Sequence, residues 1–239
     1  MTAELTIAGR RIADDEPPWV VAEASSNHQG DGQKLELLIR AAAAAGVDAI
    51  KLQKRDNQAL FTAAEYQRPV DADVYFGTTY GAHREALELQ HSAWVRVRSL
   101  CAELGLTWFA TPFDVASLEF LAEYSMPIVK LASASICNES LLAAVRDYGR
   151  PVILSTGGAT IAEITAALDI LGSRIDVAIL HCTAEYPCPI GDLNLACLDT
   201  LALEFPGHVI GLSSHSEWLG EGPLAWAHGA RIFEKHFTL

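Results

Sequence analysis

Strand-like and helix-like segments alternate along nearly the whole 239-residue chain, and this alternation restricts the possible folds more than any other feature. Short apolar runs predict eight buried strands, at 19–23, 49–53, 107–111, 128–131, 152–155, 177–181, 209–213 and 232–237. Longer amphipathic runs between them predict seven helices, at 33–45, 92–104, 115–124, 139–148, 161–171, 195–205 and 223–228. Such alternation requires parallel strands that are joined by right-handed crossovers.

Eight parallel strands close most naturally into an α/β fold of the (β/α)8 TIM-barrel type. A doubly wound open sheet is the alternative, but no G-x-G-x-x-G motif follows the first strand. We therefore predict one barrel domain over 1–239. Residues 1–18 are expected to form an N-terminal hairpin or cap that turns at Ala8-Gly9, and 54–90 an irregular active-site loop.

The sequence reaches the eighth strand without an eighth helix. The last strand and its neighbours are therefore expected to expose an apolar strip. We predict that another segment or another chain covers this strip, or that the sequence is a fragment.

Composition excludes several classes of function. The net charge of −13 argues against a nucleic-acid or membrane-surface role. No apolar run reaches the ~20 residues that span a bilayer, and the N-terminus has no signal-peptide pattern. The five cysteines are an odd number without a C-x-x-C pair, which is typical of free thiols in a reducing cytoplasm.

Polar side chains gather at the predicted carboxyl ends of the strands. Lys51 and Lys130, with surrounding Ser and Thr hydroxyls, suit a carboxylate and a phosphate. The turn S-T-G-G-A-T at 155–160 opens onto a helix and can present backbone N–H groups to an anion. Glu23, followed by Asn27 and His28, indicates acid-base chemistry or binding of sugar hydroxyls.

Two histidines follow the last two predicted strands. Alternation along a strand places Glu234 and His236 on one face and Lys235 on the other, so Lys235 is expected to point away from the site. Together with His215 they could hold a divalent metal or carry out acid-base chemistry. Hydrogen-bonded core histidines are the alternative.

Three helix starts carry local capping signals. Ser92 is expected to be an N-cap, Thr160 forms a capping box with Glu163, and Asp114 is interpreted as a cap rather than as a catalytic group.

A series of ordered motifs then identifies a family. The motifs A-E-A-S-S-N-H-Q-G-D, D-A-I-K-L-Q-K, T-P-F-D, P-V-I-L-S-T-G-G-A-T, H-C-T-A-E-Y-P, G-L-S-S-H and E-K-H-F-T-L resemble those of the sialic acid synthase (N-acetylneuraminate synthase) family. These enzymes condense phosphoenolpyruvate with an N-acylated mannosamine or a related amino sugar and release phosphate. The resemblance covers residues 19–239.

The resemblance implies roles for individual positions. His215 and His236 match metal ligands, with Mn²⁺ expected and Mg²⁺ or Co²⁺ as alternatives, and Glu23 and Glu234 match acids at the reaction centre. The remaining matches are to substrate-binding residues: Lys51, Thr111, Lys130, Ser133, Ser155 and Ser213 for phosphoenolpyruvate, and Asn27, Gln53 and Tyr186 for the amino sugar.

The sequence departs from the family pattern in three places. Ala134-Ser135 replaces Gly-Glu or Gly-Asp, and Ser214 replaces an aspartate. The eighth helix and a C-terminal antifreeze-like domain, which contributes an arginine to the partner's sugar site in relatives, are also absent from the sequence.

The expected function is therefore carbon–carbon bond formation between phosphoenolpyruvate and an N-acyl amino sugar, in a cytoplasmic homodimer. One alternative is a phosphoenolpyruvate-binding barrel that uses a different aldehyde. The other is a catalytically weak fragment or partner subunit.

Overall fold

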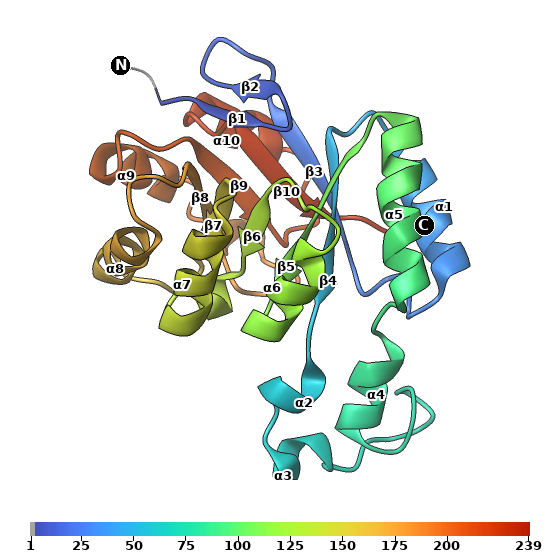
Figure 1. Ribbon diagram of the computed structural model, residues 1–239. Helices are drawn as coiled ribbons and strands as arrows, with labels where there is room; N and C mark the ends of the chain where they lie inside the picture. Colours follow the sequence, from blue (N-terminus) through green and yellow to red (C-terminus); the bar gives the residue numbers. More distant parts are fainter. Residues whose placement is uncertain (1–2) are drawn as a thin grey trace.

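The computed structural model describes residues 3–239 and shows a closed barrel of eight parallel strands (Figure 1). Each strand pairs with its neighbour in chain order, and the last pairs with the first, in the order β10-β3-β4-β5-β6-β7-β8-β9. The strands are β3 (Trp19–Ser25), β4 (Ala49–Lys54), β5 (Thr107–Pro112), β6 (Val129–Leu131), β7 (Val152–Ser155), β8 (Val177–Cys182), β9 (Ile210–Ser214) and β10 (Ile232–His236). The predicted barrel is confirmed, and the open-sheet alternative is excluded.

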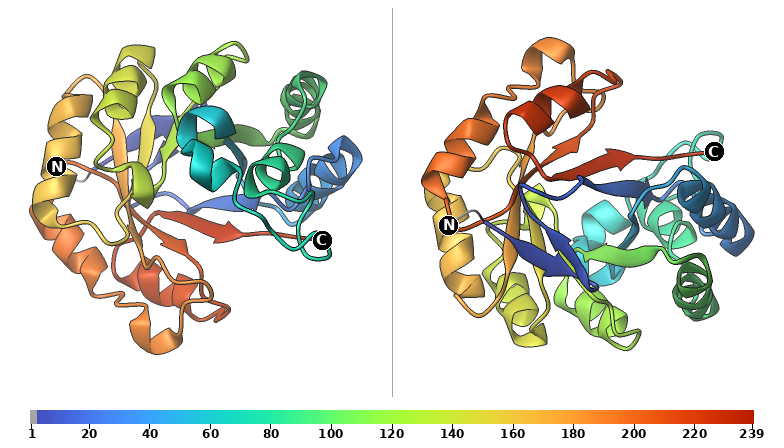
Figure 2. Two further views of the ribbon diagram at one scale, coloured as in Figure 1. Left: turned by 90° about the horizontal axis from the view of Figure 1, so that it is seen from below. Right: turned by 90° about the horizontal axis from the view of Figure 1, so that it is seen from above.

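Seven helices alternate with the barrel strands and form an outer ring around them (Figure 2). They are α1 (Gly32–Ala44), α5 (His91–Leu104), α6 (Val115–Ala122), α7 (Glu139–Tyr148), α8 (Ile161–Leu171), α9 (Cys197–Glu204) and α10 (Glu221–Ala227). All seven predicted helices are present, with boundaries that differ by at most two residues. No helix within residues 3–239 is long and apolar enough to cross a membrane.

A two-stranded antiparallel hairpin precedes the barrel. Strands β1 (Leu5–Ile7) and β2 (Arg10–Ile12) turn at Ala8 and Gly9, which have φ values of +48° and +85°. The hairpin lies across the N-terminal end of the barrel, opposite the loops that follow the strands (Figure 1). It buries Leu5, Ile7 and Ile12 against the core, as expected for a cap.

The connection from β4 to α5 is more regular than the sequence indicated. It contains three short helices, α2 (Asn57–Leu60), α3 (Ala63–Tyr66) and α4 (Tyr80–Ala86), which extend beyond the C-terminal end of the barrel (Figure 1). The prediction of an irregular segment therefore holds only for the stretches between these helices. One or two helical turns are too short to show a 3.6-residue hydrophobic period, so only the capping residues Asp56, Thr62 and Thr79 mark their starts.

Two of the three predicted caps are confirmed. Asp114 accepts a hydrogen bond from the Ser117 N–H at 2.7 Å, and Thr160 and Glu163 form a reciprocal capping box. The prediction for Ser92 was wrong, because α5 begins at His91 and its N-cap is Gln90, whose side chain makes no capping bond.

The strands pack closely inside the barrel. Trp19 of β3 stacks on Phe109 of β5, with ring centroids 5.8 Å apart. A Cβ atom at Gly211 in β9 would lie 2.4 Å from Leu180 Cδ2 and 2.5 Å from the Ile232 carbonyl oxygen. Only glycine therefore fits where β9 lies between these neighbours.

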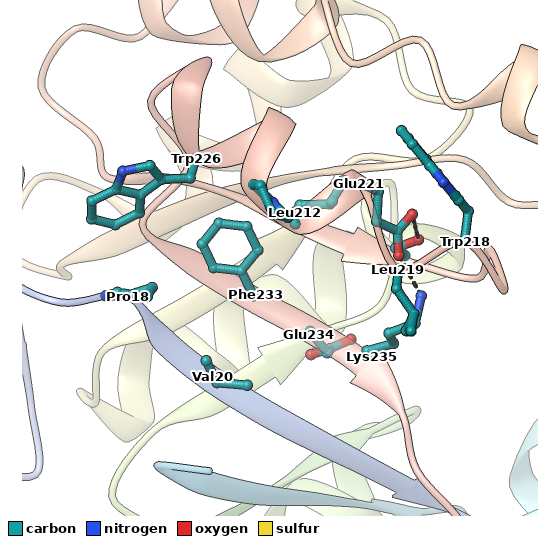
Figure 3. A pocket seen from close by; sticks show the side chains of 13 residues that line it. Pro18, Val20, Leu212, Trp218, Leu219, Glu221, Trp226, Phe233, Glu234 and Lys235 are labelled. Carbon is teal, nitrogen blue, oxygen red and sulfur yellow. Dashed lines mark hydrogen bonds and ion pairs between the residues drawn. The ribbon is translucent and has the colours of Figure 1, made fainter. Parts of the chain in front are cut away.

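The outer faces of β9, β10 and β3 form an apolar groove beside α10 (Figure 3). Its volume is about 480 Å³, and Val20, Leu212, Phe233 and Trp226 contribute to its lining. The predicted apolar strip beside the last strand is confirmed. Lys235 points into this groove, where it forms an ion pair with the buried Glu221 of α10, so its predicted exclusion from the site is also confirmed.

Candidate active site

A hollow of about 330 Å³ opens at the C-terminal end of the barrel. Every barrel strand, or the loop that directly follows it, contributes to its wall. The lining residues are Glu23, Lys51, Gln53, Arg55, Thr111, Phe113, Lys130, Ala132, Ser133, Ala134, Ser155, Cys182, Ala184, Tyr186, Ser213, His215, Glu234 and His236. The barrel thus brings twelve of the thirteen predicted site residues to one place.

Lys51 stands between two carboxylates at the centre of the hollow. Its Nζ lies 3.1 Å from Glu23 Oε2 and 3.1 Å from Glu234 Oε1, and it donates a hydrogen bond to Thr111 Oγ1 at 3.3 Å. All three charged groups are at least 94% buried. Two acids share this cation because β3 and β10 are hydrogen-bonded neighbours in the closed barrel.

The two carboxyl groups have opposite pKa shifts. Burial raises the pKa of Glu23 above its ordinary value, against the attraction of Lys51, and the nearby Glu234 charge raises it further. Burial also disfavours ionisation of Glu234, but the charges of Lys130 and Lys51 and hydrogen bonds from Lys51 and Ser213 lower its pKa to about 2. A pair of acids with divergent pKa values provides one group that can carry a proton and one that stays ionised.

Lys130 forms the second cationic wall. It donates a hydrogen bond to Ser155 Oγ at 2.7 Å and lies 3.8 Å from Glu234 Oε1. Burial lowers its pKa to about 8, although the charge of Glu234 opposes the shift. Lys130 is therefore charged at neutral pH and can bind an anion.

The turn after β7 brings its backbone against the loop after β6. The Gly157 N–H donates a hydrogen bond to Ser133 Oγ at 2.9 Å. A Cβ atom at position 157 would lie 3.0 Å from that oxygen and 3.0 Å from the Cys182 carbonyl oxygen. Glycine therefore allows Ser133 to be held at the edge of the hollow beside Ser155.

The two histidines lie together, with ring centroids 5.5 Å apart. The Nδ1 of His215 is 2.8 Å from the Thr183 carbonyl oxygen, which orients the ring and leaves Nε2 available as a ligand. Tyr186 stacks on His215 with centroids 3.7 Å apart. Burial lowers the pKa of both His215 and His236, so the neutral form that binds metals is favoured.

These side chains fit a partial metal site. Residues 3–239 contain no group of three or more His, Cys, Asp or Glu side chains that could hold a metal ion. Two neutral imidazoles at one rim, however, suit a divalent ion that takes its other ligands from substrate and water. In the same hollow, Glu234 Oε2 is buried without a hydrogen-bond partner, which leaves an acceptor for a bound group.

One predicted site residue lies elsewhere. Asn27 does not line the hollow; its side-chain amide donates a hydrogen bond to the Phe237 carbonyl oxygen at 2.8 Å and holds the segment after β10. The neighbouring His28 is buried, accepts a hydrogen bond from the Gly30 N–H at 3.0 Å and has a pKa lowered to about 4 by burial. His28 is therefore a neutral structural histidine.

Sequence reasoning missed Arg55, Phe113 and Cys182. Arg55 directly follows the motif that carries Lys51 and Gln53, and that proximity was the available signal. Its Nη1 donates a hydrogen bond to Gln53 Oε1 at 2.6 Å, and the Gln53 amide in turn donates to Glu23 Oε1 at 2.8 Å.

The two positions at which the family has an acid and this chain has a serine are 135 and 214. Ser135 is buried and does not line the hollow, and Ser214 donates a hydrogen bond to Glu221 on the outer side of the barrel. Neither serine side chain therefore lies in the wall of the hollow, whereas Ala134 does.

A closed (β/α)8 barrel with paired acids, two buried lysines and two histidines at the C-terminal strand ends has the architecture of a TIM-barrel enzyme. The family profile described as "NeuB family" matches residues 38–239. The chain belongs to the NeuB family.

Similar proteins with known names share the barrel. The chain is 33% identical over 223 residues to an N-acetylneuraminate-9-phosphate synthase of Drosophila melanogaster, covering 92% of this chain and 60% of that protein. It is 33% identical over 225 residues to an N,N'-diacetyllegionaminic acid synthase of Campylobacter jejuni, covering 92% and 67% respectively. The chain thus spans about 60% of the length of the Drosophila protein and 67% of the Campylobacter protein.

A solved structure agrees with this relationship. The crystal structure of an N-acetylneuraminic acid (sialic acid) synthetase from Leptospira borgpetersenii serovar Hardjo-bovis, in complex with citrate, superposes with a TM-score of 0.88. The two sequences are 33% identical, and the match covers 100% of this chain and 79% of that chain.

Proposed function

We propose that this chain is a nonulosonic acid synthase that condenses phosphoenolpyruvate with the open-chain aldehyde of an N-acyl amino sugar. Membership of the NeuB family and the names of its relatives support this class of reaction. The relatives' names differ in the sugar acid produced, so the class of substrate is an N-acylated amino sugar of the mannosamine type.

The observation that carries the proposal is the Glu23–Lys51–Glu234 cluster with Lys130 beside it. A buried site that holds two cations together with one protonatable and one ionised carboxyl suits a trianionic substrate that develops positive charge during reaction.

Phosphoenolpyruvate would lie along the β5–β7 side of the hollow. Lys130 and Lys51 neutralise its phosphate and carboxylate, and the hydroxyls of Thr111, Ser133 and Ser155 donate hydrogen bonds to its oxygens. The aldehyde would lie toward the histidines and Tyr186. Ser213, which donates a hydrogen bond to Glu234 Oε1 at 2.9 Å, keeps that carboxylate in place between the two substrates.

The reaction joins C3 of phosphoenolpyruvate to the aldehyde carbon. The electron pair of the C2–C3 double bond forms the new bond, and Glu23 gives its proton to the aldehyde oxygen, which becomes a hydroxyl. Positive charge then develops at C2, where ionised Glu234 stabilises it. Water adds at C2 and transfers one proton to Glu23. The C2–O bond to phosphate then breaks, the proton of the new C2 hydroxyl leaves with the phosphate, and a 2-keto acid remains.

His215 and His236 would hold a divalent ion, with Mn²⁺ expected. Such an ion supplies Lewis-acid polarisation of the aldehyde oxygen. The Thr183 carbonyl orients the His215 ring, and Tyr186 packs against both His215 and His236, so the two imidazoles are held at one rim of the hollow.

The remaining part of the proposal concerns the domain organisation and assembly of the whole chain. We propose that 1–239 acts as one synthase domain in a homodimer of the cytoplasm, with 1–18 as a cap and 54–90 as an active-site loop. The position of Arg55 in the wall of the hollow supports the role of that loop.

The test is an activity assay. The protein is incubated with Mn²⁺, phosphoenolpyruvate and N-acetylmannosamine, and released phosphate and 2-keto acid are measured in the same sample. Equal amounts of both products are expected. Products with unrelated aldehydes alone would indicate the phosphoenolpyruvate-binding barrel with another acceptor, and no product with any aldehyde would indicate a subunit without catalytic activity.

A further inference from the structure

Two partly buried arginines near the hollow lack the carboxylate partner that the other partly buried arginines of residues 3–239 have. Arg55 and Arg84 are the only arginines of residues 3–239 that are neither exposed nor within 4.0 Å of a carboxylate oxygen. A partly buried cation without an anion is costly, and a bound anion would relieve the cost.

Arg55 is held rigidly at the wall of the hollow. Its guanidinium lies 3.6 Å from the centre of the Phe113 ring, and its Nη1 donates to Gln53 Oε1. Stacking and this one hydrogen bond fix the plane of the group while leaving further N–H donors for a ligand. Gln53 links Arg55 directly to Glu23, so a group bound at Arg55 is part of the same hollow as the reacting atoms.

A second cavity shares Arg55 with the hollow. This cleft of about 380 Å³ lies between α2 and α6, and Lys54, Asn57 and Ser117 also line it. Asn57 is 99% buried, and among residues 3–239 neither its Oδ1 nor its Nδ2 has a hydrogen-bond partner. A buried amide without partners in a cleft with two cations is an independent sign of a missing polar ligand.

Arg84 strengthens the positive charge beside this cleft. It lies on α4, which packs against α2 (Figure 1). Its Nε is buried without a hydrogen-bond partner in the described chain. Burial, and after it the charge of Arg84, lower the pKa of Arg55 to about 10, although Glu88 and Glu23 oppose the shift.

The acids around the cleft are already engaged. Glu88 pairs with Lys54 at 2.9 Å, Asp56 caps α2, and Asp114 caps α6 and accepts from the Asp56 N–H. Glu85 is exposed and accepts a hydrogen bond from Tyr66. Glu88 and Glu23 attract Arg55 from a distance, but no carboxylate oxygen of residues 3–239 lies within 4.0 Å of the Arg55 or Arg84 guanidinium.

We propose that Arg55, with Lys54, Asn57 and Arg84 beside it, binds a phosphomonoester carried by the acceptor sugar, at the end distant from the aldehyde. This inference rests on the proposed function and makes it more specific. The site lies on β4 and the loop after it, whereas Lys130, Ser133 and Ser155, which bind phosphoenolpyruvate in that proposal, lie on β6 and β7. Two anions can therefore be bound at separate walls of one hollow, with the reacting carbons between them.

The experiment compares N-acetylmannosamine 6-phosphate with N-acetylmannosamine as acceptors. We expect the wild-type protein to favour the phosphorylated sugar. Arg55→Met keeps the apolar stem against Phe113 and should reduce the preference, measured as the ratio of the two kcat/KM values, by roughly 10- to 100-fold, the range expected for a charge-assisted hydrogen bond. Arg55→Lys should restore part of the preference.

Arg68→Met is the matched control. Arg68 belongs to the same connection and lies 4.7 Å from the Tyr80 ring, but it is exposed and paired with Glu65. It should leave the preference unchanged. An equal loss for both acceptors in Arg55→Met, or a rise confined to the KM of phosphoenolpyruvate, would overturn the proposal.

Binding calorimetry, which requires no turnover, separates this inference from the proposed function. N-acetylmannosamine 6-phosphate should bind more tightly than inorganic phosphate or N-acetylmannosamine, and Arg55→Met should remove the difference. If such Arg55-dependent binding occurs without any 2-keto acid formation, the proposed reaction fails and the anion site stands. If product forms but the sugar phosphate binds no more tightly than inorganic phosphate, the reaction stands and the sugar-phosphate site is refuted.

Discussion

Replacing Lys51 with methionine tests the electrostatics on which the proposed chemistry depends. Lys51 Nζ lies 3.1 Å from an oxygen of Glu23 and 3.1 Å from an oxygen of Glu234. After the replacement Glu234 keeps Lys130 at 3.8 Å, whereas Glu23 loses its ion-pair partner. Methionine has a similar length and fits a buried position, so the change removes mainly the charge.

The expected loss of folding stability follows from the pKa shifts of Glu234 and Glu23. A carboxyl such as Glu234, whose pKa falls from 4.5 to about 2 on folding, stabilises the folded state by about 3 kcal/mol at neutral pH. This contribution is present above the unfolded pKa and is lost as the pH falls toward 2. Lys51 supplies part of it, and its removal also leaves Glu23 buried without a cation, so we expect a loss of roughly 3–5 kcal/mol at pH 7.

The pH dependence gives the sharper test. Glu23 has a raised pKa in the folded state, so it favours folding at low pH and loses this contribution as the pH rises from its unfolded pKa through its folded pKa. Without Lys51 the folded pKa of Glu23 rises further. The variant should therefore continue to lose stability, by up to about 1.4 kcal/mol per pH unit, to higher pH than the wild type does.

The assay is urea unfolding of the wild type and of Lys51→Met between about pH 5 and pH 8. The double variant Lys51→Met/Glu23→Gln removes the unpaired carboxylate and should recover most of the loss and its pH dependence. A loss below about 0.5 kcal/mol, or one that is independent of pH and unaffected by Glu23→Gln, would refute the shared-cation interpretation.

Three further predictions concern ligands. His215→Ala or His236→Ala should weaken Mn²⁺ binding in calorimetry by at least about tenfold while the thermal unfolding midpoint stays near that of the wild type; retained affinity in both variants would contradict the metal assignment. The pKa of about 8 for Lys130 predicts that the KM for phosphoenolpyruvate rises above pH 8 by up to about tenfold per pH unit, because the uncharged amine no longer binds the anion. Lys130→Arg should flatten this rise, since arginine stays charged. A wild-type KM that stays constant up to about pH 9.5 would contradict the role of Lys130 in binding the anion. Gly157→Ala should displace Ser133, since a Cβ atom would lie 3.0 Å from its Oγ, and should raise the KM for phosphoenolpyruvate more than that for the sugar; an equal change in both KM values would indicate a general loss of structure.

Local patterns in the sequence were sufficient for the barrel and for most of the candidate site. Alternating apolar segments specify parallel strands, and the two-residue period of a strand decides which side chains face inward. Glu234 and His236 were therefore assigned to the hollow and Lys235 to the outside, as the structure has them. The caps at Asp114 and Thr160 were also predictable, because a cap depends on residues within one helical turn.

The properties that give these residues their chemistry depend on contacts across the closed barrel. Pairing of β3 with β10 aligns Glu23 with His236, 213 positions later in the chain, and brings both acids to Lys51. The divergent pKa values of Glu23 and Glu234, the unpaired state of Arg55 and the outward direction of Ser214 all arise from burial and from neighbours that are distant in sequence. The sequence by itself determined which side chains reach the rim of the barrel, because that depends on backbone periodicity. Only the tertiary structure decided their charges and partners, because electrostatic energies depend on distance in space and on the exclusion of water.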